Sequence, residues 1–394
     1  MNVLHYLPRV VLADGGVVRS VLDLCALLAS SGHSVTLLST HAPDAPEPWR
    51  AGGSGLPHLV EVPPPTRPMG LFSPAAAAAL EPMLRSCDVV HLHTPWETSN
   101  TQLATLARRA SRPYVVTVHG MLDDWCMAQK RLKKRIYLSL AGRALLERAA
   151  RVHCTAQAEH DQASKWYPRG RGVVIPLAVD LAEYRDLPGP EAAIERIPAL
   201  ASASQRVLFL SRLHVKKGVH VAIDAIAGVA GAHLFLAGVG DEDYARGLRE
   251  QVERLGLADR VHFLGLVTGR EKLSLYQACE VFVLPTSQEN FGLVLPEAMA
   301  CRTPVVTTRG VDIWPELEAS GGAVIADATP GAFAETIRVL LADPDRRREM
   351  GERGRAWVFE HLDASRVVER FVALYREVIA EGRGGTPATR APGP

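Results

Sequence analysis

Residues 284–297 read LPTSQENFGLVLPE, and three kinds of local structure follow one another in this stretch. The apolar run Val281–Pro285 has the length of a buried strand, polar residues then form a turn, and a helical pattern starts at Pro296. Strand, turn and helix in this order predict one unit of a parallel sheet that is covered by helices.

The same unit recurs along the chain in two series, one in residues 1–180 and one in residues 203–360. The segment between them, from Asp180 to Ser204, is rich in Pro, Ala and charge and predicts a domain linker. The Pro-rich stretch 42–74 predicts a loop. The expected strands are Val3–Leu7, Val35–Ser39, Val89–His91, Tyr114–Val118 and Val173–Ile175 in the first series, and Arg206–Leu210, His233–Ala237, Val261–Leu264, Val281–Pro285 and Pro304–Thr308 in the second.

Length and composition agree with an α/β protein of two domains. The chain has 394 residues, whereas single cores stop growing near ~250–300 residues. Hydrophobic residues make up 47% and charged residues 22%, which is typical of a globular enzyme. Because 44 Lys and Arg face 43 Asp and Glu, the overall charge gives no broad attraction for nucleic acid.

Cysteine usage and the N-terminal sequence predict a cytoplasmic protein. The six cysteines form no CxxC pair and lack the spacing of a structural zinc site, so we expect reduced core residues. The first residues, MNVLHYLPRVVLADGG, lack the basic start and apolar core of a signal peptide, and no run approaches the ~20 apolar residues that span a bilayer.

Two cations follow the first strand of the second series, where residues 211–218 read SRLHVKKG. Arg212 and Lys217 would direct two positive charges at one diphosphate. Positive charge there stabilises a nucleoside diphosphate as it leaves. A solvated basic loop is the alternative.

Two carboxylates stand on either side of the turn that precedes Pro296. Glu297 falls in the first turn of the predicted helix, where backbone N–H groups suit a phosphate, and it could accept hydrogen bonds from a ribose diol. Glu289 lies eight residues earlier, near the place where the transferred sugar would sit if the phosphates occupy the start of the helix. Either could instead be a solvated carboxylate. Between them, Asn290 and Gly292 tolerate positive φ, so the backbone can approach a ligand closely.

In the first series, two strands end in residues suited to a ligand site. Gly15 and Gly16 end the first strand and open a helix, whose amides could bind donor phosphates. His119 follows the strand Tyr114–Val118 and so stands at a carboxyl end, where α/β sheets bind ligands. A structural histidine is the alternative.

Together, these motifs resemble glycosyltransferase family four. Its most specific mark is a pair of glutamates separated by seven residues, here Glu289 and Glu297 with Asn-Phe-Gly-Leu between them. Ser-Arg-Leu…Lys-Lys-Gly before this pair, Gly-Gly-Val-Val-Arg near the start, and Glu-Ala-Met-Ala-Cys-Arg-Thr-Pro-Val-Val after it extend the resemblance from about Val3 to about Val372.

The resemblance implies the GT-B architecture, in which two Rossmann-like domains face each other across a cleft, and transfer with retention of anomeric configuration. It also implies that a final helix over 365–380 packs back on the first domain. Residues 382–394 hold almost no large apolar side chain and predict a disordered tail.

The resemblance also assigns roles to single residues. Arg212 and Lys217 bind the donor phosphates, and Glu297 binds the ribose. Glu289 and His119 are the expected catalytic residues, with front-face attack assisted by the departing phosphate and no covalent nucleophile. No metal and no cofactor are expected. The remaining donor-binding residues are Gly16, Asn290, Phe291, Gly292 and Leu293.

One segment departs from the family pattern. Residues 175–180 read IPLAVD, so Leu177 and Ala178 stand where relatives commonly carry Asn-Gly after the proline. Because of this difference, the geometry of the hinge or of the acceptor side does not follow from the family pattern.

A basic segment in the first series points to the acceptor. Residues 129–138, QKRLKKRIYL, predict a helix in which Leu132, Ile136 and Leu140 recur every four residues. The helix could contact an anionic membrane or face a phosphorylated acceptor, and a solvated surface helix is the alternative. A saccharide or a lipid-linked acceptor, with peripheral contact at the inner face of the membrane, is the corresponding expectation.

The predicted function is therefore transfer of a hexose or N-acetylhexosamine from a nucleotide sugar to a hydroxyl acceptor, in polysaccharide or glycoconjugate assembly. A nucleotide-sugar epimerase or a phosphorylase of the same fold is the main alternative, and a non-catalytic sugar-nucleotide binding module is a second. A nicotinamide oxidoreductase is excluded because no G-x-G-x-x-G follows the first strand.

Overall fold

The computed structural model of the protein describes residues 1–65 and 70–384. The chain forms two compact units, one of Met1–Ala178 together with Ala364–Pro394 and the other of Val179–Asp363. From residue 385 on, the tail expected at 382–394 lies outside the described residues.

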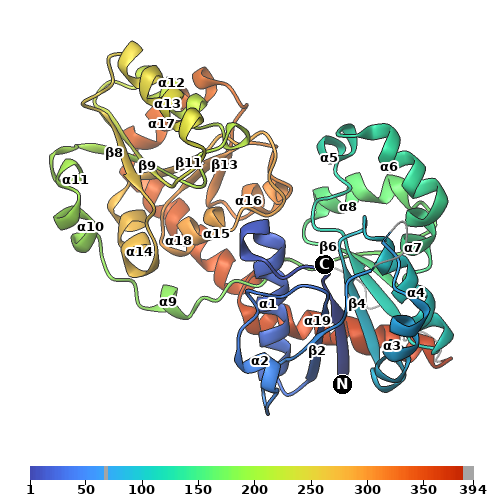
Figure 1. The fold of residues 1–394 in the computed structure, drawn as a ribbon. Coiled ribbons are helices and arrows are strands. Elements are labelled where there is room, and N and C mark those ends of the chain that lie inside the picture. The colour runs from blue at the N-terminus through green and yellow to red at the C-terminus, as the bar shows by residue number, and fades with distance from the viewer. Residues whose placement is uncertain (66–69, 385–394) are drawn as a thin grey trace. The chain divides into compact units, whose positions relative to one another are not determined.

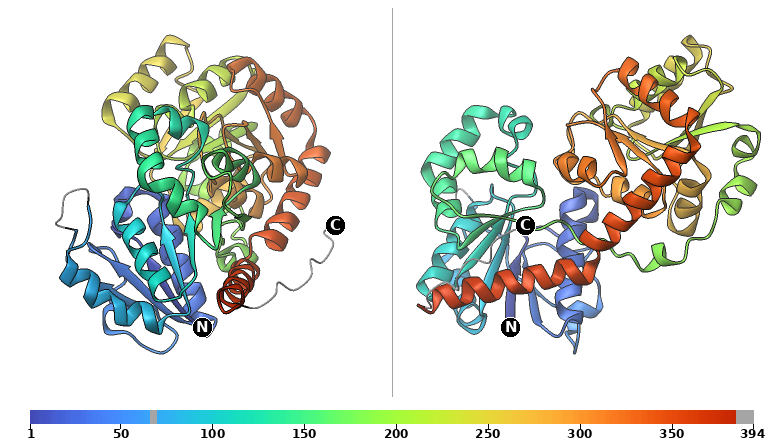
Figure 2. Two further views of the ribbon diagram at one scale, coloured as in Figure 1. Left: turned by 90° about the vertical axis from the view of Figure 1, so that its right-hand side faces the viewer. Right: turned by 180° about the vertical axis from the view of Figure 1, so that it is seen from behind.

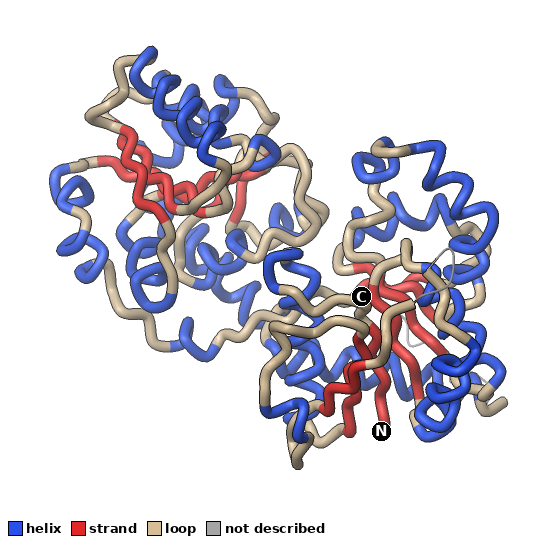
Figure 3. Tube along the Cα trace, viewed as in Figure 1, coloured by secondary structure: helices blue, strands red, loops and turns tan. Residues whose placement is uncertain are grey.

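The first unit is built on a sheet of seven parallel strands in the order β3-β2-β1-β4-β5-β6-β7 (Figures 1 and 3). This order, which turns back after β1, is that of a Rossmann-like sheet. Its strands are β1 (Asn2–Tyr6), β2 (Ser34–Ser39), β3 (His58–Glu61), β4 (Val89–His93), β5 (Tyr114–Thr117), β6 (Arg151–Cys154) and β7 (Gly172–Val174).

Helices cover both faces of this sheet. Successive side chains of a strand point to opposite faces, so Val89 packs with helices α1 and α19 while Val90 packs with α3 and α4. The α-helices are α1 (Gly16–Ser30), α2 (Pro48–Ala51), α3 (Pro74–Ser86), α4 (Thr98–Arg109), α5 (Asp124–Ala128), α6 (Arg131–Tyr137), α7 (Arg143–Glu147), α8 (Gln157–Ala163) and α19 (Ala364–Gly382), with a π-helical turn at Leu138–Gly142 and 3-10 turns at Leu12–Asp14 and Ser164–Trp166.

Helix α19 returns from the end of the chain to the first unit and runs along its sheet (Figure 2). Its buried face, which includes Val367, Phe371 and Tyr375, joins the core on the α1 side of the sheet. Arg151 of β6, whose side chain is almost fully buried, forms ion pairs with Glu377 and Glu381 of α19. The last helix is thereby part of the core that positions β1, β4 and β6.

The second unit repeats the plan with a sheet of six parallel strands in the order β10-β9-β8-β11-β12-β13. Pairing is in register along all six residues of β8 and β9, from Gln205↔Ala232 to Leu210↔Ala237. The strands are β8 (Gln205–Leu210), β9 (Ala232–Ala237), β10 (Val261–Gly265), β11 (Val281–Leu284), β12 (Val305–Thr307) and β13 (Ala323–Ile325).

The helices of the second unit lie on both sides of its sheet (Figure 3). Helix α15 follows β11, and α12 follows β8 through a 3-10 turn at Val215–Lys217. The α-helices are α9 (Ala182–Arg185), α10 (Glu191–Arg196), α11 (Pro198–Ser202), α12 (Val219–Ala227), α13 (Glu242–Arg254), α14 (Gly269–Ala278), α15 (Val294–Ala300), α16 (Trp314–Ala319), α17 (Pro330–Ala342) and α18 (Pro344–His361).

Three local expectations were wrong. The stretch 42–74 is not all loop, because His58–Glu61 pairs with β2 as an edge strand. The segment expected to be a linker forms α9, α10 and α11 within the second unit, and Ser274 Oγ accepts a hydrogen bond from the Ala193 backbone N–H at 2.9 Å. Two short strands were also missed, namely β6, which reads RVHC, and β13, which reads AVI. No helix among the described residues is long and apolar enough to span a bilayer.

Candidate functional site

The loops after β8 and β11 meet at the point where the strand order of the second sheet reverses. Lys216 O, in the β8 loop, accepts hydrogen bonds from Ser287 N at 2.8 Å and from Thr286 Oγ1 at 2.9 Å, both in the β11 loop. Ligands of open α/β sheets bind at such reversal points. Arg212, Lys217 and Glu289, three of the charged residues expected from the sequence, lie on these two loops, and Glu297 lies on helix α15, which follows the second loop.

Gly218 permits this close approach. Its φ is +70°, and a Cβ atom built on it would lie 2.0 Å from Pro285 O. A side chain here would therefore push the two loops apart. The glycine stands directly after Lys217 and before α12, so it also sets the direction of the Lys217 backbone.

Lys217 and Glu289 form an ion pair across the two loops, with side chains 15% and 22% exposed. The Glu289 backbone is held by Gly310 O, which accepts its N–H at 2.8 Å. Burial, and then the positive charges of Arg212 and Lys216, lower the pKa of Lys217 to about 8. The expected phosphate-binding lysine and the expected catalytic carboxylate are thus direct neighbours.

Arg212 lines a pocket of about 480 Å³ at the carboxyl ends of β8, β9 and β10. This volume lies within the usual range of ligand pockets. Among the described residues no carboxylate pairs with Arg212, so its charge is available to a ligand. Gly238 and Gly240, also in the lining, were not expected: Cβ atoms there would lie 1.9 Å from Ser211 O and 2.0 Å from Leu213 O.

Glu297 lies on α15, which begins at Val294 and not at Pro296 as expected. Its carboxylate is held from α14 on both oxygens: Lys272 Nζ lies 2.9 Å from Oε1, and the Tyr276 hydroxyl donates to Oε2 at 3.2 Å. Neither partner was found from the sequence, because the packing of α14 on α15 is tertiary. The carboxylate is therefore fixed in position.

The loop from Asn290 to Leu293 is pinned on one side by the segment after β12. Asn290 Nδ2 donates to Asp312 Oδ2 at 3.2 Å, and Asp312 N donates to Glu289 O at 3.0 Å. Gly292 has φ +66°, as its expected role requires, and Leu293 directly precedes α15. Phe291 is 3% exposed, so its ring belongs to the core.

In the first unit, Gly16 is the first residue of α1, and Gly15 before it has φ +112°. His119, after β5, has the positive φ of 51° that is uncommon for a residue with a side chain. His119 lines a cavity of about 30 Å³, and Leu177 and Ala178, which depart from the family pattern, line it too. Gly16 does not line this cavity.

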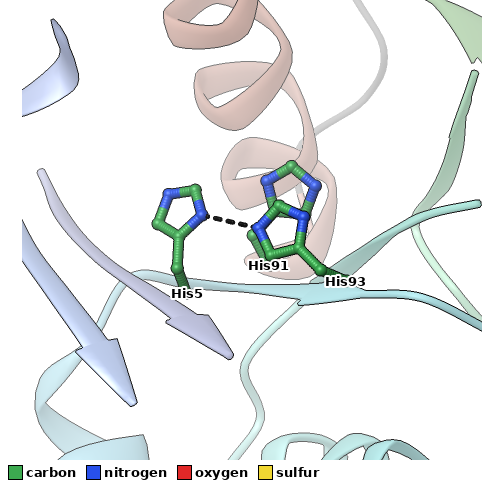
Figure 4. Close-up of side chains that lie close together, drawn as sticks. All are labelled: His5, His91 and His93. Atoms are coloured by element: carbon green, nitrogen blue, oxygen red, sulfur yellow. Dashed lines mark hydrogen bonds between the residues drawn. The ribbon is translucent and has the colours of Figure 1, made fainter. Parts of the chain in front are cut away.

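A group of buried histidines lies behind His119, on the sheet face that α19 covers. His5 of β1 stands opposite His91 of β4 in the strand register, and His93 follows two residues later on the same face (Figure 4). His5 Nδ1 lies 3.0 Å from His93 Nε2, and His93 Nδ1 lies 3.1 Å from His119 Nε2. Burial lowers the pKa of His5 and of His119 to about 3, so these rings are neutral near pH 7.

His5, His91 and His93 are the group among the described residues whose ligand atoms converge enough to suggest a metal, since these atoms lie within 4.8 Å of one another. Both ring nitrogens of His91 already have partners, however. Tyr375 Oη lies 2.6 Å from Nδ1 and Thr117 Oγ1 lies 2.6 Å from Nε2. A metal would have to displace one of these bonds, so the side chains fit a hydrogen-bonded cluster better.

Two family models match the chain. The model described as Glycosyl transferase 4-like domain matches residues 15–178, and the model described as Glycosyl transferases group 1 matches residues 191–357. The first lies in the unit that contains His119, and the second spans every cation and carboxylate described above for the second unit.

Two curated relatives show how far the similarity extends. The phosphatidyl-myo-inositol mannosyltransferase of Mycolicibacterium smegmatis is 30% identical over 346 residues, which cover 84% of this chain and 82% of that protein. The D-inositol 3-phosphate glycosyltransferase of Segniliparus rotundus is 28% identical over 293 residues. That match covers 71% of this chain and 64% of the relative.

Among solved structures, Anabaena HepE in complex with UDP is similar with a TM-score of 0.77. The alignment covers 95% of this chain and 100% of that chain, at 21% sequence identity. At that identity the likeness shows the fold. The two Rossmann-like folds expected for a GT-B protein are thus both present.

Proposed function

We propose that this chain, which belongs to the group 1 glycosyl transferases, transfers a hexose or N-acetylhexosamine from a nucleotide sugar to a hydroxyl acceptor with retention. The observation that carries the proposal is a pair of neighbouring cations with a carboxylate: Arg212 lines a pocket of about 480 Å³, and Lys217, close enough for the charge of Arg212 to lower its pKa, forms an ion pair with Glu289. A diphosphate needs cations, and a sugar needs a fixed carboxylate nearby.

Each of the site residues in the second unit has a separate role in binding the donor. Arg212 and Lys217 hold the diphosphate and neutralise it as it leaves. When the donor binds, its phosphate pairs with Lys217 in place of Glu289. The Glu289 carboxylate then accepts hydrogen bonds from the hydroxyl groups of the donor sugar. Glu297, which Lys272 and Tyr276 hold in place, accepts hydrogen bonds from the ribose. The following loop, Asn290–Leu293, contributes backbone groups.

In the first unit, His119 contacts the donor sugar near the anomeric carbon as a neutral ring, and Gly16 offers a backbone N–H to the phosphates. Because cations and backbone dipoles already stabilise the diphosphate, we propose that the reaction needs no metal ion and proceeds by front-face attack. Activity that persists in a chelator supports this part of the proposal, and loss that only a divalent cation restores contradicts it.

A donor screen tests the proposal directly. The protein is incubated with UDP-, GDP-, ADP- and dTDP-sugars, and release of nucleoside diphosphate and of sugar is followed. We expect slow hydrolysis of one donor, at least ~10-fold slower in Lys217→Ala and in Glu297→Gln. Lys165→Ala, which removes a lysine from an exposed ion pair with Asp124, is the matched control and keeps full activity.

The same assay separates the rival functions. An epimerase converts the donor into an isomer without releasing the nucleoside diphosphate, and a phosphorylase requires inorganic phosphate. A binding module binds the donor and leaves it intact. The relatives named for D-inositol 3-phosphate and phosphatidyl-myo-inositol suggest the first acceptors to add, namely a soluble inositol phosphate and phosphatidylinositol in vesicles.

A lipid-linked acceptor is supported by the surface of α6 and the turn after it. Leu132 and Leu140 are 74% and 80% exposed, and Ile136 between them is half exposed. Among the described residues no carboxylate pairs with Arg131 or with the other basic residues of this surface, Lys130, Lys133 and Arg135. Exposed leucines beside free cations are typical of helices that lie on anionic membranes.

Lys134 takes no part in this surface, because it points inward. Its Nζ donates to Cys126 O at 2.6 Å and lies 5.1 Å from the centroid of the Trp96 ring. Co-sedimentation with vesicles tests the surface: we expect binding to anionic but not to neutral vesicles, and loss of binding in Leu132→Ser with Leu140→Ser. Val339→Ser, at a half-exposed apolar residue of the second unit, is the control.

A further inference from the structure

Two hydrogen-bonded chains of side chains cross the buried histidine cluster, and the direction of the first can be worked out atom by atom. His153 Nε2 lies 2.7 Å from the Ile175 carbonyl oxygen, which only accepts, so His153 carries its proton on Nε2. Its Nδ1 then accepts from the Thr117 hydroxyl at 2.8 Å. Thr117 Oγ1 accepts from His91 Nε2, and His91 Nδ1 accepts from the Tyr375 hydroxyl.

The second chain runs from His5 through His93 to His119 and has no carbonyl group at either end. His93 is bonded at both nitrogens to another histidine. A neutral imidazole has one N–H and one lone pair, so His93 donates one of these bonds and accepts the other. Burial lowers the pKa of all three rings, which keeps them neutral.

Only two proton arrangements satisfy both bonds. In the first, all three rings carry the proton on Nε2, and His119 presents a lone pair at Nδ1. In the second, all three carry it on Nδ1, and His119 presents an N–H. The remaining atom at the far end is His5 Nε2, which is buried and has no hydrogen-bond partner among the described side chains and backbone.

The far end decides between the two arrangements. The first leaves a buried N–H of His5 without an acceptor, whereas the second leaves only a lone pair there. Buried N–H groups without a partner are rarer in proteins than acceptors with unused lone pairs. The second arrangement is therefore the more stable one.

We propose that His5 and His93 are positioning residues that hold His119 as a neutral ring with its proton on Nδ1. His119 then acts on a ligand as a hydrogen-bond donor and not as a general base. A ring held in one tautomer by the partner of its other nitrogen is a recognised way to orient a functional histidine. For contact with a donor sugar, the inference rests on the proposed function.

Nitrogen NMR of the uniformly 15N-labelled, full-length protein tests the proposal without any substrate. The His119 resonances are assigned from a His119→Ala spectrum. At pH 7 we expect Nδ1 of His119 to be protonated and Nε2 to be unprotonated. The opposite pattern overturns the proposal, and so does a mixture of the two.

A variant at the far end of the chain should reverse the tautomer. In His5→Asp a carboxylate that can only accept replaces the ring, so His93 must donate to it through Nε2 and must accept from His119 Nε2–H. We expect the His119 proton to move to Nε2, although residue 5 does not contact His119. An unchanged His119 spectrum in folded His5→Asp contradicts the proposal.

His5→Asn is the matched control, because its amide group can donate to His93 and should keep the original tautomer. Tyr375→Phe removes a hydroxyl from the other chain and should also leave His119 unchanged. If His5→Asp does not fold, His93→Leu replaces it, with loss of the single tautomer of His119 as the expected result. Zinc in a stoichiometric amount that is lost from His93→Leu overturns the proposal in favour of a metal site.

Kinetics give the functional counterpart. If the donor screen identifies a donor, kcat/KM should fall at least about five-fold in His5→Asp and remain near the wild-type value in His5→Asn, the change expected for one lost hydrogen bond. The NMR result stands whether or not a donor is found. Failure of the tautomer proposal and failure of the proposed function are therefore distinguishable.

Discussion

At the scale of single residues, Lys217 gives the second unit a pH-dependent charge. Its pKa is lowered to about 8, so the ammonium group loses its proton as the pH rises through this value. We expect KM for the donor to rise between pH 7 and pH 9, since a neutral amine binds phosphate weakly. In Lys217→Arg the guanidinium stays charged over this range, and KM should not change with pH. A wild-type KM that is flat up to pH 9 would contradict the role of Lys217.

Gly218 provides a test of the contact between the β8 and β11 loops. Gly218→Ala adds a methyl group where Pro285 O lies 2.0 Å away, in a backbone conformation with φ +70°. We expect a loss of more than about 1 kcal/mol in the free energy of unfolding, and weaker donor binding. Gly256→Ala, at φ +65° with nothing within 4 Å, is the matched control for backbone strain alone. Equal losses in urea unfolding would count against the clash.

The residues of the second unit were found from sequence because strand ends in a parallel sheet carry the ligand site, and 211–218 and 286–293 follow predicted strands. The side chains that hold these residues in place were not found from the sequence. Lys272 contacts Glu297 only because α14 packs against α15, and Asp312 reaches Asn290 only because β12 lies beside β11. His5 and His93 meet because β1 pairs with β4, a neighbour that the local pattern does not reveal.

At the scale of elements, β1, β4, β5 and β6 make the first unit sensitive to acid. Burial lowers the pKa of His5 and His119 to about 3 and that of His153 to about 4, below the value of ~6.5 in an unfolded chain. The unfolded chain therefore binds more protons below pH 6.5. Stability is fully present above pH 6.5 and is lost as the pH falls toward 3.

We expect this loss to reach up to about 1.4 kcal/mol per pH unit for each histidine below pH 6. The free energy of unfolding is measured in urea at pH 7.0 and pH 5.5, and hydrogen exchange reports the stability of each unit separately. The first unit should be destabilised much more than the second, where the cluster is absent from the described residues. Equal destabilisation of both units would show that the cluster is not responsible.

Prediction of the elements themselves succeeded where a strand is a continuous apolar run. Val35–Ser39 and Arg206–Leu210 differ from β2 and β8 by one residue at one end. It failed at β3 and β6. The edge strand β3 reads HLVE, with only two apolar residues between polar ends, and β6 opens with Arg151, whose charge is compensated by ion pairs to α19. The short helices α9–α11 are stabilised by tertiary packing, which propensity does not show.

At the scale of the whole molecule, the account places the nucleotide in the second unit. A nucleoside diphosphate at 100 times its Kd should stabilise the protein by about 2.7 kcal/mol. Hydrogen exchange should then slow in residues 211–218 and 286–293 and remain unchanged around β2 and β3. Protection confined to the first unit would place the nucleotide elsewhere. The facing arrangement of the two units and the cleft stay predictions of the family resemblance.

The central claim is glycosyl transfer from a nucleotide sugar, and proton NMR of the reaction mixture tests it most directly. The anomeric signals of the donor are followed with time in the presence of the protein and an acceptor. The account predicts that the donor signal disappears, free nucleoside diphosphate accumulates, and the new anomeric signal has the configuration of the donor. A new nucleotide-sugar signal without release of nucleoside diphosphate, or a product of inverted configuration, would contradict it.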